Sequence, residues 1–292
     1  MKIAILSILA DTHFVKLFAQ EARRCSHVVD VINYLECSTN IDEGELSVTY
    51  EGKRLDSYDV VIPRIASGYS TFGLNVLGHF ESSNTYCLNH SGAIRNSKDK
   101  FKALTILANN KLRVPHSTAC FSKTSVEDQY QSFESSTVIL KKNESTQGEG
   151  VFKVNSLKEI QFLMDQSDQS FFLQEYIEES RGEDIRVLVL GEKVIAYMLR
   201  QAPPGEFRSN LHLGGIAKQV EITQEEREMA IKAGQALDLK FAGVDILRSK
   251  SGPMLLEVNS APGLKGLVEV GFNGLESQIL DFIEKDLVKI ID

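Results

Sequence analysis

Short apolar runs alternate with stretches of helical periodicity along the first third of the chain. Three of these runs have the length and composition of buried strands: Ile3–Leu6, Val28–Ile32 and Val60–Ile62. Between the first two, apolar residues recur at helical spacing from Phe14 to Ala22. This alternation predicts a small α/β layer built on a mainly parallel sheet. The opening run is short and is closed by Asp11, so we interpret it as a strand and not as a signal peptide.

The middle of the chain has longer polar loops between its apolar segments. Apolar spacing predicts one helix over residues 91–111 and another over 157–164. Strands are predicted at 137–141, 151–154 and 171–177. The loop between the first two strands carries Gly148 and Gly150, and glycines let backbone N–H groups wrap around an anion. The loop is therefore a candidate phosphate flap, although a hairpin loop without a ligand has the same pattern.

Residues 179–292 contain the clearest strand and turn signals. Two strands, Asp184–Leu190 and Lys193–Arg200, are joined by a tight turn at Gly191 and Glu192. Thr223 followed by Glu226 predicts a capping box at the start of a helix, and Leu275–Ile291 has the pattern of an amphipathic closing helix. We place domain boundaries at 1–95, 96–178 and 179–292.

A hairpin near the C-terminal end predicts an acidic site. The turn residues 250–253 separate two apolar strands, and a turn centred on Ser251 places Leu247 opposite Leu255 and Asp245 opposite Glu257. Because side chains alternate along a strand, Asp245, Glu257 and Asn259 then share one face, while Val244, Ile246, Leu256 and Val258 pack on the other. Opposed carboxylates repel unless a cation compensates them, and carboxylate and amide oxygens suit Mg²⁺. A solvated acidic patch is the alternative, and a one-residue bulge would spoil this geometry.

Composition and charge narrow the class of protein. The chain has 292 residues, of which 42% are hydrophobic and 25% are charged, and its formal net charge is −8. An acidic chain without clustered Lys and Arg disfavours direct nucleic-acid binding. No run approaches the about 18 apolar residues of a membrane helix. The four cysteines lack metal-site spacing and predict reduced thiols in a cytoplasmic protein: Cys25, Cys37, Cys87 and Cys120.

Two common nucleotide-binding motifs are missing from the sequence. No G-x-G-x-x-G follows the first strand, and no Walker motif follows the glycine-bearing loop. Lys100 could reach a phosphate or be a solvated helical charge, and Arg64 at a strand end could face a cleft or the solvent.

Taken together, these segments resemble the ATP-grasp superfamily and, within it, the RimK family of glutamate ligases. The most specific stretches are Thr146-Gln147-Gly148, Gln174-Glu175-Tyr176-Ile177, Asp184-Ile185-Arg186, Phe207-Arg208-Ser209-Asn210-Leu211-His212, Ala242-Gly243-Val244-Asp245-Ile246-Leu247 and Glu257-Val258-Asn259. The resemblance implies an α/β and α+β fold, in which an N-terminal Rossmann-like pre-ATP-grasp layer precedes two α+β subdomains that clasp ATP.

The resemblance also implies roles for individual residues. ATP contacts are expected from Lys100, Lys141, Ser145, Thr146, Gln147, Gly148, Gln174, Glu175, Tyr176, Ile177, Asp184, Arg208, Ser209 and Asn210. Metal ligands are expected at Asp245, Glu257 and Asn259, which agrees with the hairpin argument. The implied cofactors are ATP and two Mg²⁺ or Mn²⁺ ions. Ser145 departs from the family pattern, because we expect glycine there, and it should stiffen the flap.

The chemistry expected from this resemblance is amide formation through an acyl phosphate. We expect Arg186, Arg200 and Arg208 to hold the substrate carboxylate and the developing acyl phosphate, since guanidinium forks match such anions. The implied partners are glutamate and a carboxylate acceptor, the C-terminal tail of ribosomal protein S six, and the implied assembly is a homo-oligomer, a tetramer. Three alternatives stay open: a ligase acting on a small molecule, a carboxylate or hydroxyl kinase, and a non-catalytic nucleotide-binding regulator.

Overall fold

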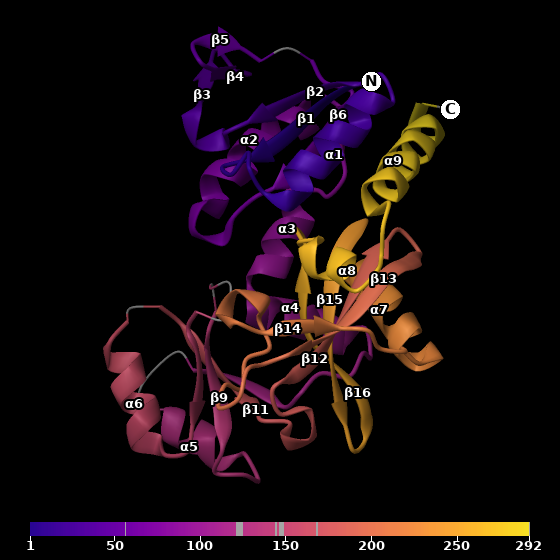
Figure 1. Ribbon diagram of the computed structural model, residues 1–292. Helices are drawn as coiled ribbons and strands as arrows, with labels where there is room; N and C mark the ends of the chain where they lie inside the picture. The colour runs from indigo at the N-terminus through magenta and orange to yellow at the C-terminus, as the bar shows by residue number, and fades with distance from the viewer. Residues whose placement is uncertain (56, 121–124, 144, 146–148, 168, 292) are drawn as a thin grey trace.

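Three units follow one another along the chain and meet at the centre of the molecule (Figure 1). The computed structural model describes residues 1–55, 57–120, 125–143, 145, 149–167 and 169–291. The first unit is an α/β layer, the second a small antiparallel sheet with its helices, and the third a larger antiparallel sheet. Within these ranges, no helix is both long enough and apolar enough to cross a membrane.

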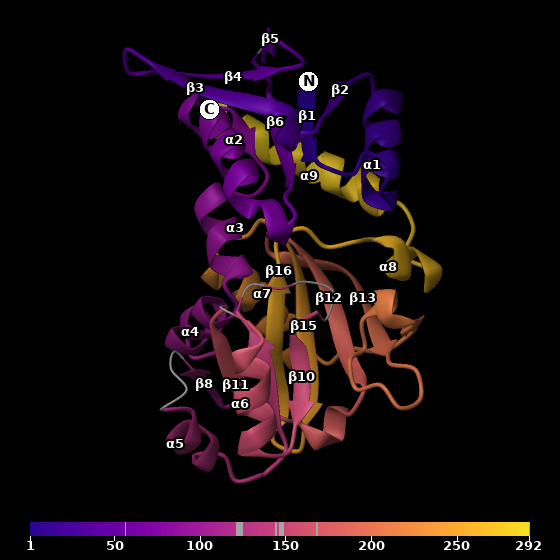
Figure 2. The ribbon, with the colours of Figure 1, turned by 90° about the vertical axis from the view of Figure 1, so that its left-hand side faces the viewer.

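The first unit is built on a parallel four-stranded sheet in the order β2-β1-β6-β7. Its parallel character agrees with the sequence prediction, which named three of these strands. Its strands are β1 (Lys2–Ser7), β2 (Val28–Ile32), β6 (Val60–Arg64) and β7 (Tyr86–Cys87). Its helices are α1 (His13–Arg24), α2 (Ser70–Ser82) and α3 (Ser91–Lys98). A second, antiparallel sheet projects from this unit and contains β3 (Cys37–Asp42), β4 (Glu45–Tyr50) and β5 (Lys53–Arg54) (Figure 2).

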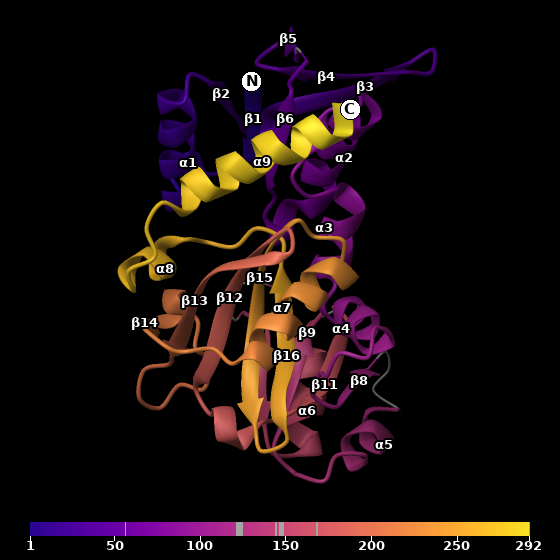
Figure 3. The same cartoon turned by 90° about the vertical axis from the view of Figure 1, so that its right-hand side faces the viewer.

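The last helix of the chain returns to the first unit. Helix α9 (Leu275–Ile291), with the predicted bounds, lies across α1 (Figure 3). Ile279 and Ile283 of α9 are fully buried in one core with Phe14 and Phe18 of α1. Polar contacts reinforce this packing, because Tyr86 Oη donates to Asp286 at 2.9 Å. The two ends of the sequence therefore share one hydrophobic core.

The middle unit begins with a helix that the sequence analysis placed incorrectly. The single helix predicted over 91–111 is two helices, α3 and α4 (Lys100–Asn109). Asp99 separates them because its backbone is extended and its side chain accepts from the N–H of Lys102, capping α4. Continuous apolar spacing concealed this break.

The middle sheet has the order β10-β9-β11-β8 and is antiparallel. Its strands are β8 (Ser117–Cys120), β9 (Val138–Lys142), β10 (Val151–Val154) and β11 (Phe171–Glu175). Helices α5 (Val126–Gln131) and α6 (Leu157–Asp165) pack their apolar residues against it, so this unit has a small core of its own.

The third unit is a five-stranded antiparallel sheet in the order β14-β13-β12-β15-β16. Its strands are β12 (Glu183–Leu190), β13 (Lys193–Gln201), β14 (Ile216–Lys218), β15 (Phe241–Ser249) and β16 (Gly252–Asn259). Helix α7 (Gln224–Ala236) has the predicted capping box and covers one face, and the short helix α8 (Lys265–Glu269) follows β16. The tight turn at Gly191 is also confirmed.

The register of the β15–β16 hairpin is only partly as predicted. Asp245 is opposite Glu257, but Leu247 is opposite Met254 and not Leu255. An irregularity in the pairing next to Asp245 accounts for the difference. It brings Leu255 into the buried core beside Val244, whereas Leu256, predicted on that face, is only partly buried. The bulge was expected to spoil the acidic face, but it is what brings Glu257 opposite Asp245, because the pairing of Ile246 with Leu255 would otherwise continue to Leu256.

Candidate active site

A cavity of about 770 Å³ opens where the three units meet. It is lined by every described residue that the sequence analysis assigned to the site: Lys100, Lys141, Ser145, Gln174, Glu175, Tyr176, Ile177, Asp184, Arg186, Arg200, Arg208, Ser209, Asn210, Asp245, Glu257 and Asn259. Thr146, Gln147 and Gly148 lie outside the described residues. The residues come from segments far apart in the sequence, and the fold gathers them around one space.

The predicted metal ligands occupy the cavity side of the β15–β16 hairpin. Asp245 and Glu257 are directly opposed across the two strands. Asn259, two residues after Glu257, is on the same face of β16, and its Nδ2 donates to Glu257 Oε1 at 3.1 Å. The apolar face of the hairpin packs against α7, whose Ala230 and Ala233 are fully buried there. This packing fixes the direction in which the two carboxylates point.

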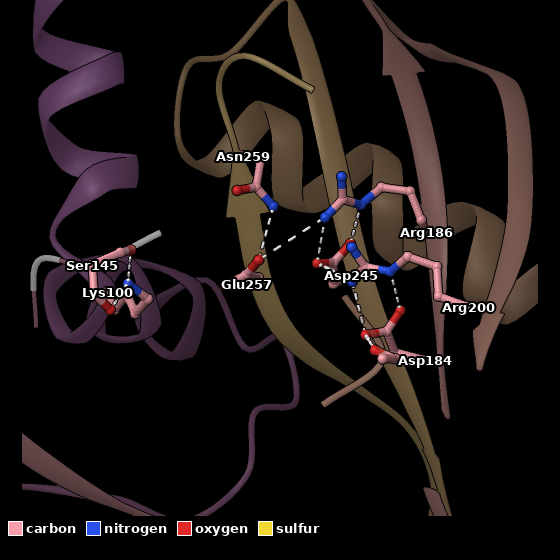
Figure 4. Close-up of polar contacts among 9 residues, drawn as sticks. Lys100, Ser145, Asp184, Arg186, Arg200, Asp245, Glu257 and Asn259 are labelled. Atoms are coloured by element: carbon pink, nitrogen blue, oxygen red, sulfur yellow. Dashed lines mark hydrogen bonds and ion pairs between the residues drawn. The ribbon is translucent and has the colours of Figure 1, made fainter. Parts of the chain in front are cut away.

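Arginines from the neighbouring strands engage these carboxylates (Figure 4). Arg186 on β12 forms a fork with both oxygens of Asp245, with Nη2 2.7 Å from Oδ2. Arg200 on β13 forms a second fork with Asp184, at 2.6 and 2.7 Å, and its Nη2 also reaches Asp245 Oδ2 at 2.7 Å. The four side chains form a continuous buried network of alternating charge.

The environment shifts the pKa values of the two carboxylates of the hairpin in opposite directions. Burial raises the pKa of Asp245 to about 6, against the opposing attraction of Arg186 and Arg200. Burial would also raise the pKa of Glu257, but the charges of Lys100 and Arg186 lower it to about 2. Both groups are therefore mainly ionised at neutral pH, with Glu257 the more strongly so.

Two lysines face this acidic hairpin from the middle unit. Lys100 is the first residue of α4, and its Nζ donates to the carbonyl oxygen and, at 3.1 Å, to the Oγ of Ser145. Lys141 on β9 is only 7% exposed and has no hydrogen-bond or ion-pair partner in the described ranges. Burial lowers its pKa to about 8, although the charge of Glu257 opposes this shift. A buried ammonium group without a partner is suited to bind an anion.

The other described residues predicted to contact ATP are positioned mainly by β11 and by the loop after β13. Gln174 is buried and donates to Ser117 Oγ at 3.0 Å, so its amide is directed into the sheet. The hydroxyl of Tyr176 is buried without a partner in the described part of the chain. Ser209 donates its hydroxyl proton to Asp184 and so joins the charged network.

Arg208 differs from the other two predicted arginines because it lies in a loop. Its guanidinium contacts the carboxylate of Glu206 at 2.7 and 3.1 Å. The hydrogen bonds from Arg208 lower the pKa of Glu206 to about 2. All three arginines expected to hold a substrate carboxylate thus contact carboxylates of the protein itself.

The donor set of the hairpin fits a divalent cation in its chemistry. Asp245, Glu257 and Asn259 supply hard oxygen atoms, and Mg²⁺ accepts such ligands together with water and phosphate oxygens. In the described residues, no three His, Cys, Asp or Glu side chains are grouped as a metal site. A cation here would therefore need oxygens from a bound nucleotide, and Asp245 would have to release a guanidinium contact.

Arg64 and Lys98 also line this cavity, although neither was among the predicted site residues. The sequence leaves Arg64 undecided between cleft and solvent, and Lys98 Nζ donates to the carbonyl oxygen of Ile65 at 2.8 Å. Gly243 next to the network has no room for a side chain: a Cβ would lie 2.8 Å from Pro262 Cβ and 3.2 Å from Arg186 Cδ. In the sequence, only the position of Arg64 at the end of a strand indicated that it could face the cavity.

Comparison with protein families gives two matches that together cover almost the whole chain. Residues 97–283 match the RimK-like ATP-grasp domain, and residues 1–94 match the RimK PreATP-grasp domain. A "Probable alpha-L-glutamate ligase" of Aeromonas salmonicida (strain A449) is 41% identical over 287 residues, 97% of this chain and 96% of the relative. One of Coxiella burnetii (strain RSA 493 / Nine Mile phase I) is 40% identical over 293 residues, 98% and 96% of the two chains.

Solved structures share the fold at much lower sequence identity. The ATP-grasp ligase PsnB, in complex with a minimal precursor, has a TM-score of 0.73 at 18% identity, over 97% of this chain and 98% of that chain. A RimK domain protein from Sphaerobacter thermophilus DSM 20745 has a TM-score of 0.73 at 15% identity, over 97% and 99%. At these identities the similarity establishes the ATP-grasp fold with its N-terminal pre-ATP-grasp domain.

Proposed function

The chain belongs to the RimK-like ATP-grasp family and is an ATP-dependent ligase, and from this premise we propose that it adds glutamate to the C-terminal carboxylate of a protein. The acceptor that we propose is the tail of ribosomal protein S six. Relatives that are 40–41% identical over 96% of their length are each named "Probable alpha-L-glutamate ligase", which supports glutamate as the amine substrate. ATP and Mg²⁺ are the proposed cofactors, and one structural neighbour is a complex with Mg and ADP.

One observation supports phosphoryl transfer in this cavity above all others. Lys141 is a buried cation with no hydrogen-bond or ion-pair partner in the described residues; its Nζ lies 5.9 Å from the ring centre of Phe172, and it is near enough to Glu257 for their charges to interact. A phosphate chain bound between Lys141 and the acidic hairpin would pair with the lysine on one side. A metal ion held by Asp245, Glu257 and Asn259 would neutralise the phosphate chain on the other side.

The remaining residues then have defined tasks in amide formation. Transfer of the γ-phosphoryl group to the acceptor carboxylate forms an acyl phosphate and ADP. The amine nitrogen then forms a bond to the acyl carbon, the bond from that carbon to the phosphate oxygen breaks, and the amine loses a proton. The negative charge on the oxygens of the acceptor carboxylate and of the acyl phosphate is stabilised by Arg186, Arg200 and Arg208. Each arginine would exchange its contact with a protein carboxylate for a contact with the substrate when the substrate binds.

Mass spectrometry of candidate acceptors tests this proposal. The S six tail is incubated with the protein, ATP, Mg²⁺ and glutamate, and ADP release is followed with and without glutamate. We expect a ladder of glutamyl additions and ADP release that requires the amine. Glutamate-dependent ADP release without a ladder would refute the S six tail as the acceptor. ADP release at the same rate with and without glutamate would indicate a kinase.

Peptides other than the S six tail are the second class of acceptor to include in this assay. PsnB is seen with a precursor peptide and AMPPNP, and the macrocyclase MdnC is seen with the precursor peptide MdnA. Both share the fold of this chain, at 17% and 13% identity. A ladder on a synthetic acidic peptide, with none on the S six tail, would show that the acceptor is a peptide other than the S six tail.

A further inference from the structure

Arg64 is a cationic residue of the cavity that the chemistry described above does not use. It is the last residue of β6, at the carboxyl end of the parallel sheet, where it is opposite Ser7 of β1. Its guanidinium lies over the ring of Phe14, 4.1 Å from the ring centre. Its Nη1 donates to the carbonyl oxygen of Pro262 at 2.9 Å. These two contacts hold the guanidinium at the wall of the cavity.

The partners of Arg64 distinguish it from the other arginines of the cavity. Arg186, Arg200 and Arg208 each contact a carboxylate, whereas Arg64 contacts none in the described part of the chain. A guanidinium has five N–H donors, and the Pro262 carbonyl accepts from only one nitrogen. Burial lowers the pKa of Arg64 to about 10, so the group stays charged at neutral pH. A charged group with unused donors at a cavity wall is suited to bind an anion.

The position of Arg64 separates it from the phosphate-facing lysines. Lys100 and Lys141 belong to the middle unit, whereas Arg64 belongs to the N-terminal sheet. Pro262 follows Asn259 by three residues, a stretch that spans at most about 11 Å when fully extended. Arg64 is therefore within one small molecule's length of the acidic hairpin, on a different wall of the cavity.

We propose that Arg64 binds a carboxylate of the amino-acid donor, the glutamate whose amino group attacks the acyl phosphate. The acceptor carboxylate is consumed by activation and must lie beside the phosphate, where other cations serve it. Glutamate enters with two carboxylates that do not react and that lose their hydration on entering the cavity. One of them requires a cation away from the phosphate, and a planar guanidinium fork fits a carboxylate with two parallel hydrogen bonds. This inference rests on the proposed ligase function.

Steady-state kinetics with three donors test the role of Arg64. Glutamate, glutamine and isoglutamine differ only in which carboxylate is replaced by a neutral amide. In Arg64→Gln we expect the KM for glutamate to rise by about tenfold or more, with the KM for ATP and for the acceptor unchanged. The amide donor that lacks the contacted carboxylate should be used equally well by the wild type and the variant. If glutamine is the donor that both proteins use equally well, Arg64 contacts the side-chain carboxylate of glutamate. If isoglutamine is that donor, Arg64 contacts the α-carboxylate.

Two further variants separate recognition from folding. Arg23→Gln is the matched control, because Arg23 also donates to one backbone carbonyl, that of Val29 at 3.0 Å, but does not line the cavity. Arg64→Lys keeps the charge and loses the fork, so its KM for glutamate should be intermediate. If Arg64→Gln fails to fold, as judged by its melting temperature and nucleotide affinity, the three-donor comparison is made with Arg64→Lys.

The outcomes distinguish this inference from the proposed function. A wild-type protein without glutamate-dependent turnover refutes the function and the donor role together. A wild type that uses glutamate, with an unchanged KM for glutamate in Arg64→Gln, refutes the role of Arg64 alone. An equal loss with all three donors and a raised KM for the acceptor would assign Arg64 to the acceptor and also overturn the proposal.

Discussion

Replacement of Lys141 by methionine should make the nucleotide-free protein more stable. Lys141 is 7% exposed, and burial lowers its pKa from 10.5 to about 8. At about 1.4 kcal/mol for each pKa unit, keeping this group protonated costs the folded state about 3 kcal/mol at pH 7. Methionine has a similar length and carries no charge, so Lys141→Met should raise the free energy of unfolding by about that amount.

The pH dependence of this effect has a definite sign. Between the folded and unfolded pKa values, from about 8 to 10.5, the unfolded state binds more protons at Lys141 than the folded state does. The cost is therefore complete below pH 8 and disappears as the pH rises through this window. We expect the advantage of Lys141→Met over the wild type to fall from about 3 kcal/mol at pH 7 to roughly half of that near pH 9.5.

Thermal unfolding without Mg-ATP measures the stability gained by removing the buried charge, and unfolding with Mg-ATP measures the nucleotide binding that is lost. Without nucleotide, the melting temperature of Lys141→Met should exceed that of the wild type by about 6–12 °C. Mg-ATP at a hundred times its Kd should stabilise the wild type by about 2.7 kcal/mol and the variant much less. Lys142→Met is the matched control, because Lys142 is the next residue of β9 and points to the opposite face, where it is only partly buried. Its stability should change by less than about 0.5 kcal/mol.

Two results would refute this reasoning. A nucleotide-free Lys141→Met protein that is less stable than the wild type at pH 7 would show that the buried ammonium group is compensated. Equal stabilisation of the variant and the wild type by Mg-ATP would show that Lys141 does not bind phosphate.

Two further substitutions test the charged network. Gly243→Ala should displace Arg186 from its carboxylate and lower turnover by about tenfold or more, because the added Cβ lies 3.2 Å from Arg186 Cδ. Gly263→Ala, where a Cβ meets nothing within 4 Å, is the control, and equal turnover of the two variants would contradict the steric argument. Asp245→Asn should lower turnover by about tenfold or more, because the side chain loses the charge that would hold a divalent cation and the guanidinium forks of Arg186 and Arg200 lose an acceptor. Turnover equal to that of the wild type would show that the charge of Asp245 is not needed for the reaction.

The fold could be predicted where side-chain periodicity was strong and the turns were unambiguous. The parallel strands of the first unit and the helix Leu275–Ile291 follow directly from such periodicity. Asp245 and Glu257 are opposite each other as predicted, but the turn alone does not place them there: the turn pairs Ser249 with Gly252, and the register shift next to Asp245 compensates for the error in the predicted turn. The bulge was not predictable, because Met254, Leu255 and Leu256 are all apolar and either register buries a leucine.

The residues of the candidate site could be named from the sequence, but their contacts could not. The charged network joins side chains from β12, β13 and β15, and only the order of strands in the sheet makes them neighbours. Helical spacing around Asp99 gave no sign that this residue ends one helix and caps the next. Arg64 remained undecided because its environment depends on Pro262, which is 198 residues away in sequence.

The packing of α9 onto α1 has a consequence for synthesis of the protein in the cell. Phe14 and Phe18 share their core with Ile283, so this core is complete only when nearly the whole chain has been translated. At about 5–20 residues per second, some 15–55 s separate the appearance of the two ends at the ribosome. During this interval the part of α1 that packs against α9 stays uncovered, and chaperones that bind nascent chains would have their longest opportunity there. A nascent chain that lacks α9 should accordingly remain sensitive to protease in its N-terminal unit, although that unit was translated first.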